Sequence, residues 1–187
     1  MNELEVAGFL FGVAGVVLTL KENVWCFPVG LINVAVSLFL FYNQKLYADA
    51  IQQSVYIILL TYGWFGWLHG EKKNVLQISK STSSLLISCL FIWMTGTFIL
   101  GYLLQNYTDA STPWPDSAAT ILSFIAQWMI AKKKLENWLL WIVVNISYIA
   151  IYVYKDLLLY AVLFFVYLIL ALAGFYAWKK EMKTYAR

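Results

Sequence analysis

The sequence is short of charged residues. Only 12% of its 187 residues are Asp, Glu, Lys or Arg, which is about half of the roughly 25% found in soluble proteins. The 13 basic and 10 acidic side chains are too few to cover a domain of this length with the polar surface that water requires. A soluble globular fold is therefore excluded.

Residues that carry chemistry are scarce as well. There is one histidine, His69, and there are two cysteines, Cys26 and Cys89, which lie far apart in separate apolar segments. This spacing fits neither a metal site nor a disulfide framework, and no nucleophile motif accompanies His69. The phosphate-binding pattern G-x-x-x-x-G-K-[ST] is missing too. We expect no enzyme, no metal, no cofactor and no use of ATP by the chain itself.

What the sequence does contain is apolar. Hydrophobic residues make up 62% and aromatic residues 18% of the chain, and a helix that crosses a bilayer needs about 20 apolar residues. The apolar spans lie at about residues 4–20, 25–42, 47–68, 84–104, 117–131, 138–154 and 157–178. The sequence thus predicts an all-α integral membrane protein with seven transmembrane helices in a lipid bilayer.

The lysines predict the orientation of these helices, because cytoplasmic loops hold an excess of Lys and Arg. The N-terminal side of the predicted membrane carries only Lys45 and Lys155. The other side carries Lys21, Lys72, Lys73, Lys80, Lys132, Lys133, Lys134, Lys179, Lys180, Lys183 and Arg187. We expect the N-terminus outside and the C-terminus in the cytoplasm. The small net charge of +3 gives no reason to expect a nucleic-acid partner.

The chain also resembles itself. At a shift of 111 residues, Ser54–Trp67 aligns with Phe165–Trp178, and a larger shift of 112 pairs Asn33 with Asn145. This favours two copies of three helices joined by a fourth, a parallel repeat known among small transporters, with a shift that drifts through small insertions. Chance matches between apolar helices remain an alternative. The predicted parts are a first bundle (1–69), a loop and linker helix (70–110), a second bundle (111–178) and a cytoplasmic tail (179–187).

Polar residues form stripes inside the predicted spans. Helical spacing places Asp116, Thr120, Ser123 and Gln127 on one face, Trp138, Trp141, Asn145, Tyr148 and Tyr152 on another, and Asp49, Gln53 and Tyr56 on a third, with Asn33 in a fourth span. Polar groups in hydrocarbon are costly unless they face a partner or a cavity. Single residues of this kind can be interhelical hydrogen bonds. Four stripes together favour a central site for a polar aromatic solute.

The sixth span and three shorter segments carry a family resemblance. ENWLLWIVVNISY (Glu136 to Tyr148), LYADAIQQ, GWFGW and PWPDS closely resemble motifs of the PnuC family of bacterial vitamin transporters. The resemblance implies two parallel three-helix bundles joined by a linker helix (3+1+3), similar to full-length SWEET transporters. It also implies that Trp138, Trp141 and Asn145 contact the substrate together with Gln53. Gln52 departs from the pattern, where an apolar residue is expected.

These observations define the expected function. The predicted substrate-binding residues are Trp138, Trp141, Asn145, Tyr148, Gln53, Asp49, Tyr56, Asn33, Gln127 and Ser123. The resemblance favours nicotinamide riboside as substrate, with thiamine or riboflavin as alternatives, in the bacterial inner (plasma) membrane. The only ionisable candidates within the spans, Asp49 and Asp116, lie near helix starts, which favours facilitated diffusion. The resemblance implies trapping of the substrate by a cytoplasmic kinase. Association into a homo-oligomer is left open.

Overall fold

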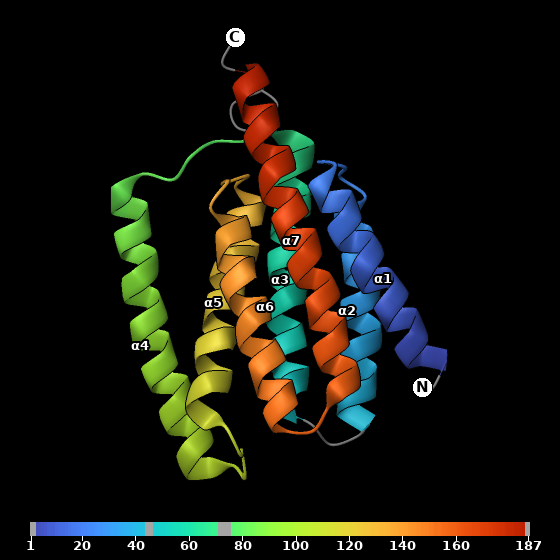
Figure 1. Ribbon diagram of the computed structural model, residues 1–187, viewed down its shortest axis with the longest axis vertical. Coiled ribbons are helices and arrows are strands. Elements are labelled where there is room, and N and C mark those ends of the chain that lie inside the picture. The colour runs from blue at the N-terminus through green and yellow to red at the C-terminus, as the bar shows by residue number, and fades with distance from the viewer. Residues whose placement is uncertain (1–2, 44–46, 71–75, 186–187) are drawn as a thin grey trace.

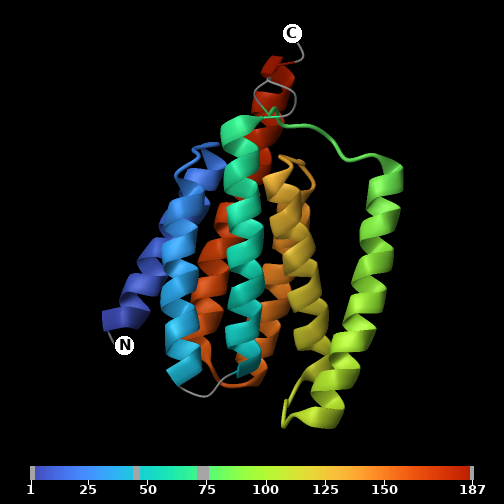
Figure 2. The same cartoon turned by 180° about the vertical axis from the view of Figure 1, so that it is seen from behind.

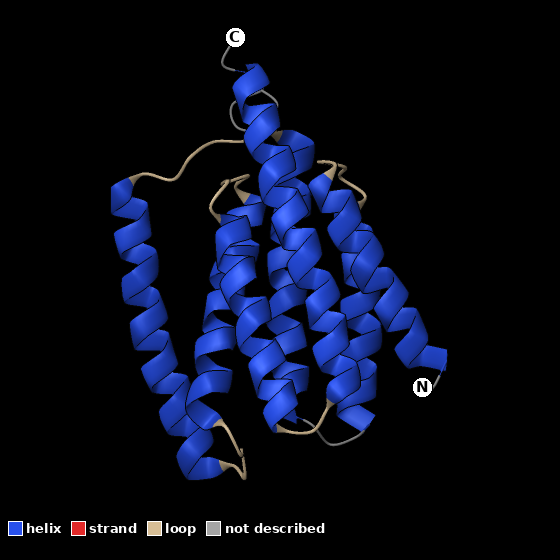
Figure 3. Cartoon of the chain, viewed as in Figure 1, coloured by secondary structure: helices blue, strands red, loops and turns tan. Residues whose placement is uncertain are grey.

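The protein is all-helical. The computed structural model describes residues 3–43, 47–70 and 76–185, and Figure 3 shows that helices account for nearly all of them. The helices are α1 (Glu3–Leu20), α2 (Cys26–Asn43), α3 (Tyr47–His69), α4 (Ser83–Tyr107), α5 (Pro113–Ala131), α6 (Asn137–Tyr154) and α7 (Leu158–Tyr185). The prediction of seven helices in this order is confirmed. Lys45, Lys72, Lys73 and Arg187, used to predict the orientation, lie outside the described residues.

Two helices are longer than expected. Helix α5 begins at Pro113 rather than near residue 117, because proline is favoured in the first turn, where its missing N–H costs nothing. Helix α7 continues to Tyr185, so the segment predicted as a tail after Trp178 is helical through most of its length. Figure 1 shows this end of α7 projecting beyond the other helices.

Six of the helices form a closed ring. Among the described residues, the helices pack in the order α1, α2, α3, α5, α6, α7 and back to α1. Figures 1 and 2 show the two sides of this ring, with α7 and α3 on opposite faces. The ring consists of two three-helix bundles, α1–α3 and α5–α7, that meet at the α3/α5 and α1/α7 contacts.

Helix α4 lies outside the ring and packs against α5 alone. The indole N–H of Trp93 donates a hydrogen bond to the carbonyl of Ala118 at 2.9 Å. Gly101 allows the ring of Trp114 to lie directly on the α4 backbone. Helix α4 is therefore the linker between the bundles, in agreement with the predicted 3+1+3 arrangement.

The exterior of the molecule is apolar. Large exposed side chains on the ring and on α4 include Ile58, Phe65, Phe91, Phe98, Ile99, Val162, Phe165 and Tyr176. Helices α2, α4, α6 and the Leu158–Thr184 part of α7 are long and apolar enough to cross a membrane, and α1 contains a shorter apolar stretch, Gly8–Leu20. Helices α3 and α5 carry polar residues that lower their hydropathy. Several of these face the interior, as described below.

The two bundles repeat each other at a constant shift of 111 residues. Helix α2 begins at Cys26 and α6 at Asn137, and both are 18 residues long. The turns before them have matching backbone bonds: Asn23 N–H to Leu18 C=O in one and Lys134 N–H to Met129 C=O in the other, each at 2.9 Å. The expected drift to 112 is therefore wrong. Apolar helices match at several registers, whereas backbone hydrogen bonds fix only one.

The bundles join through equivalent tryptophans on α3 and α7. Trp67 donates its indole N–H to the carbonyl of Ile130 at the end of α5, and Trp178 donates to the carbonyl of Thr19 at the end of α1, both at 3.2 Å. All four residues obey the shift of 111. Each bundle thus holds the first helix of the other through its own third helix.

Equivalent glycines make room for the rings that pack on these tryptophans. Gly63 lies against Phe27, and Gly174 lies against the face of Trp138. Phe27 meets Trp67 edge to face at 5.0 Å, and Trp138 meets Trp178 edge to face at 5.4 Å. A side chain larger than hydrogen at either glycine would collide with an aromatic ring.

We predict that Gly174→Ala destabilises the protein. Its Cβ would lie 2.6 Å from three ring carbons of Trp138, and such overpacking typically costs about 1–3 kcal/mol. Gly15→Ala is the matched control, because its Cβ would have only ordinary contacts at 3.9 Å. Thermal unfolding in detergent should show a lower midpoint for Gly174→Ala alone. Equal midpoints for the two variants would contradict this packing.

Candidate functional site

A polar layer crosses the interior between the two bundles. The Tyr56 hydroxyl on α3 donates to Ser123 Oγ on α5 at 2.6 Å, and Ser123 Oγ donates to the carbonyl of Thr120 at 2.7 Å. The equivalent tyrosine on α7, Tyr167, places its hydroxyl against Gly12 on α1. Because Gly12 and Ser123 are also related by 111 residues, this layer has the same symmetry as the tryptophans.

Helix α6 adds a second group of hydroxyls and rings. The Tyr148 hydroxyl lies 3.3 Å from Thr120 Oγ1, within hydrogen-bonding distance. The amide of Gln52 lies beside the hydroxyls of both Tyr148 and Tyr56. Tyr148 stacks on Tyr152 with 5.8 Å between ring centroids. The Gln52 side chain thus connects the polar residues of α3 with those of α5 and α6.

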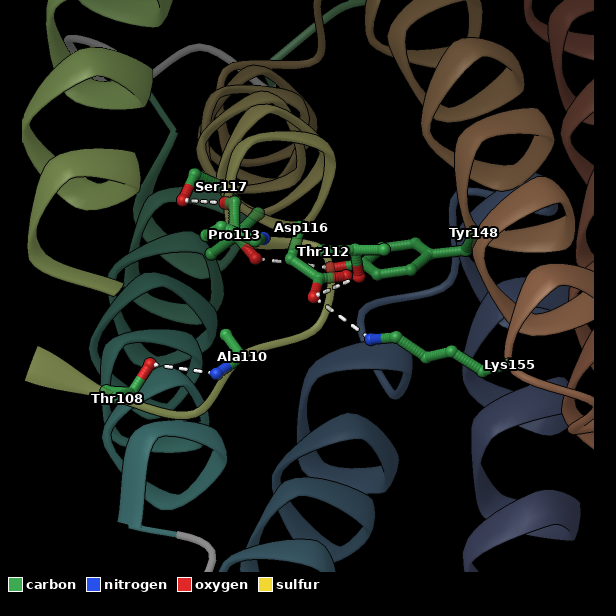
Figure 4. A network of polar contacts seen from close by, with 9 residues as sticks. Thr108, Ala110, Thr112, Pro113, Asp116, Ser117, Tyr148 and Lys155 are labelled. Atoms are coloured by element: carbon green, nitrogen blue, oxygen red, sulfur yellow. Dashed lines mark hydrogen bonds and ion pairs between the residues drawn. The ribbon is translucent and has the colours of Figure 1, made fainter. Parts of the chain in front are cut away.

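An ion pair lies at the end of the ring where α6 ends, and Figure 4 shows it beside Tyr148. Lys155 Nζ lies 3.0 Å from Asp116 Oδ2, which also accepts a hydrogen bond from Thr112 Oγ1 at 2.8 Å. Asp49, half-buried at the start of α3, lies near both charged groups. Two carboxylates therefore share one lysine at this end, which favours a cation nearby.

Trp138 and Trp141 lie towards the opposite end of α6. Both pack in one apolar cluster with Ala171 and Trp178, and Trp138 is only 2% exposed. The indole N–H groups of Trp138 and Trp141 are buried and have no hydrogen-bond partner. Buried donors are normally paired, so two unpaired donors on one helix face are available to a polar solute.

Amide side chains continue the stripe between these tryptophans and Tyr148. Asn145 is 2% and Gln127 8% exposed, while Gln53 on α3 is half-buried. Residues 138 and 148 are ten positions apart, which is about 15 Å along a helix. The predicted residues of α6 thus run along the ring axis from the tryptophans to Tyr148, beside the ion pair.

Asn33 lies in a different part of the interior. Its side-chain amide donates to the carbonyl of Gly8 on α1, and it lies near Gly12 and Tyr167. It belongs to the α1/α7 contact, whereas Tyr56 and Ser123 belong to the α3/α5 contact. The constant repeat places it opposite Val144 rather than Asn145. The sequence correctly predicted an inward polar residue but paired it with the wrong partner.

Three interior residues were absent from the predicted set. Gln52 was noticed only as a departure from a pattern, and Thr120 only as part of a stripe. Tyr167 was recognised only as the repeat partner of Tyr56, and that signal would have identified it. Among the described residues there is no group of His, Cys, Asp and Glu able to hold a metal. The interior offers hydroxyls, amides and indoles, which suit reversible binding.

Comparison with known proteins agrees with this architecture. Residues 2–180 match the family described as nicotinamide mononucleotide transporter. The crystal structure of the vitamin B3 transporter PnuC superposes with a TM-score of 0.79 at 23% identity, covering 97% of this chain and 82% of the other. The fold is therefore shared.

Individual relatives carry different substrate names. The nicotinamide riboside transporter PnuC of Escherichia coli is 23% identical over 95% of this chain and 85% of its own length. The riboflavin/roseoflavin transporter RibM of Streptomyces davaonensis is 24% identical over 76% and 68% of the two chains. Since the family match covers nearly the whole sequence, the chain belongs to the nicotinamide mononucleotide transporter (PnuC) family of membrane vitamin transporters and is not an enzyme.

Proposed function

We propose that this protein carries nicotinamide riboside across the bacterial inner membrane by facilitated diffusion. The observation that carries the proposal is the pair of buried, unpaired indole donors at Trp138 and Trp141, on the same helix as Asn145. Indole faces suit a delocalised cationic ring, and unpaired donors suit ribose or carboxamide oxygens. Gln53, Gln127 and Asn145 each offer both donors and acceptors.

Charge supports a cationic vitamin. Asp49 and Asp116 share one lysine at the end of the ring near Tyr148, so this end favours a pyridinium or a thiazolium over neutral riboflavin. The phosphate of a mononucleotide calls for a free cation instead. Within the described ring, the buried Lys133 and the part-buried Lys155 are each paired with a carboxylate. This favours the riboside over the mononucleotide.

The lysine distribution supports a cytoplasmic C-terminus. We call the end of the ring that carries Lys21, Lys132, Lys133, Lys134, Lys179 and Lys180 the lysine-rich end, where α1, α3, α5 and α7 end. Loops rich in lysine remain in the cytoplasm. Solute entering past Asp116 and leaving past the tryptophans would then move inwards, and a cytoplasmic kinase would prevent its return by phosphorylating it.

The proposal predicts an order of affinities. Purified protein should bind nicotinamide riboside more tightly than thiamine or riboflavin when the three are titrated side by side by calorimetry. The expected reason is the match of carboxamide and ribose hydroxyls to the interior amides. Thiamine bound more than tenfold tighter, a difference of about 1.4 kcal/mol, would make thiamine the substrate instead.

A second prediction concerns the tryptophans. Trp138→Ala and Trp141→Ala should each weaken binding by about 1–3 kcal/mol, the range for loss of a ring stacked on a base-like group. Trp25→Ala is the matched control, because Trp25 is 64% exposed at the start of α2 and should bind like the wild type. Wild-type affinity in both helix α6 variants would place the binding site elsewhere.

A third prediction concerns energy coupling. In proteoliposomes the substrate should equilibrate without a proton, sodium or voltage gradient, and labelled substrate should exchange at equal concentrations on both sides. The reason is that the charged groups described within the ring are tied in ion pairs rather than arranged as a relay for protons. Accumulation above the outside concentration, driven by an imposed gradient, would contradict facilitated diffusion.

A further inference from the structure

A buried ion pair joins the two bundles at the lysine-rich end. Lys133 Nζ lies 2.7 Å from Glu22 Oε2, and the two side chains are 9% and 16% exposed. The same ammonium lies over the ring of Trp67, 4.5 Å from its centroid. Charges so poorly hydrated depend on each other, because removing one leaves the other buried without a partner.

The two partners are equivalent positions of the repeat. Glu22 plus 111 gives residue 133, and both residues follow the first helix of their bundle with positive φ angles, 53° for Glu22 and 47° for Lys133. The pair therefore spans the pseudo-symmetry axis between the bundles. Two identical copies would bring like charges together here. Opposite charges at equivalent positions make this contact attractive.

A groove opens directly beside the pair. Its volume is about 520 Å³, and it is lined by Leu20, Lys21, Glu22, Lys133, Ala177, Trp178 and Glu181. Trp178 packs edge to face on Trp138 on the side of the interior. The ion pair and Trp178 thus lie between the groove and the tryptophan at the end of the proposed binding site.

We propose that the Glu22–Lys133 pair is the latch of the lysine-rich end. It holds the first helix of one bundle to the first helix of the other while the interior is closed at this end, and it breaks when the bundles separate to connect the interior with the groove. This inference rests on the proposed transport function, in which the bundles rock about the central site.

The chain contains its own reporter for this opening. Cys26 is 4% exposed at the start of α2, packs in a cluster with Phe27, and lies near Thr19 and Lys133. Separation of the bundles at this end would expose its thiol. The other cysteine, Cys89, is on the peripheral α4 and is replaced by alanine in every variant, so that Cys26 is the only thiol.

The test is the rate at which a hydrophilic maleimide labels Cys26 in lipid nanodiscs, where both ends are accessible. Glu22→Gln and Lys133→Gln should each raise the rate about tenfold by shifting the population towards the open state. The charge reversals Glu22→Lys and Lys133→Glu should raise it at least as much. Unchanged rates in the neutral variants would overturn the latch.

The double variant Glu22→Lys with Lys133→Glu is the decisive comparison. Because the two positions are equivalent, the exchanged charges can pair again, and Trp178 takes the place of Trp67 beneath the lysine. The double variant should label at the wild-type rate. Labelling as fast as in the single reversals would overturn the proposal. If the single reversals lose helix content by circular dichroism, the neutral variants and the double variant still decide.

Lys155→Gln is the matched control. It breaks the 3.0 Å ion pair with Asp116, whose side chains are 26% and 24% exposed, at the opposite end of the ring. It should leave the labelling of Cys26 unchanged. An equal rise here would mean general loosening and would overturn the latch. The assay uses no substrate: loss of vitamin transport with this labelling pattern intact would refute the proposed function alone, and normal transport without the pattern would refute the latch alone.

Discussion

The structure depends on the contacts by which the third helix of each bundle reaches the first helix of the other. Trp67 and Trp178 donate to the carbonyls of Ile130 and Thr19, where α5 and α1 end and have no further turn to satisfy their backbone groups. Tyr56 makes the same crossing at mid-helix by bonding to Ser123. These bonds are directional, whereas apolar helix faces in lipid gain little from meeting each other. They therefore set how the bundles meet.

The closed ring separates two environments. Large apolar side chains such as Ile58, Phe91 and Phe165 face outwards, while the hydroxyls of Tyr56, Ser123 and Tyr148 point at one another inside. A bilayer accepts this distribution because polar groups find partners within the protein. The polar residues that lower the hydropathy of α3 and α5 are thus explained by their position at the α3/α5 contact, where the two bundles meet.

The two ends of the ring have different chemistry. At the lysine-rich end, repeat-related residues carry opposite charges and pair with each other. At the opposite end, Asp116 and Lys155 both belong to the second bundle, and their repeat equivalents in the sequence are Glu5 and Gln44. Two copies of one unit have thus diverged most where a solute would enter and leave. A carrier that handles one solute from two unlike compartments needs such a difference, because a strictly symmetric ring would present the same groups to both sides.

The sequence by itself determined the helices, their order, the repeat and the family. Apolar runs of bilayer length form helices wherever they are placed in lipid, and inward stripes follow from helical spacing, so residues such as Asn145 and Gln127 were correctly predicted to be buried. Only the tertiary structure decided which stripes meet. Tyr56 bonds to Ser123 rather than to a residue of its own bundle, Asn33 turns to Gly8, and Glu22 pairs with Lys133. Such contacts depend on the register between bundles, which backbone hydrogen bonds at the helix ends fix and apolar sequence similarity leaves open.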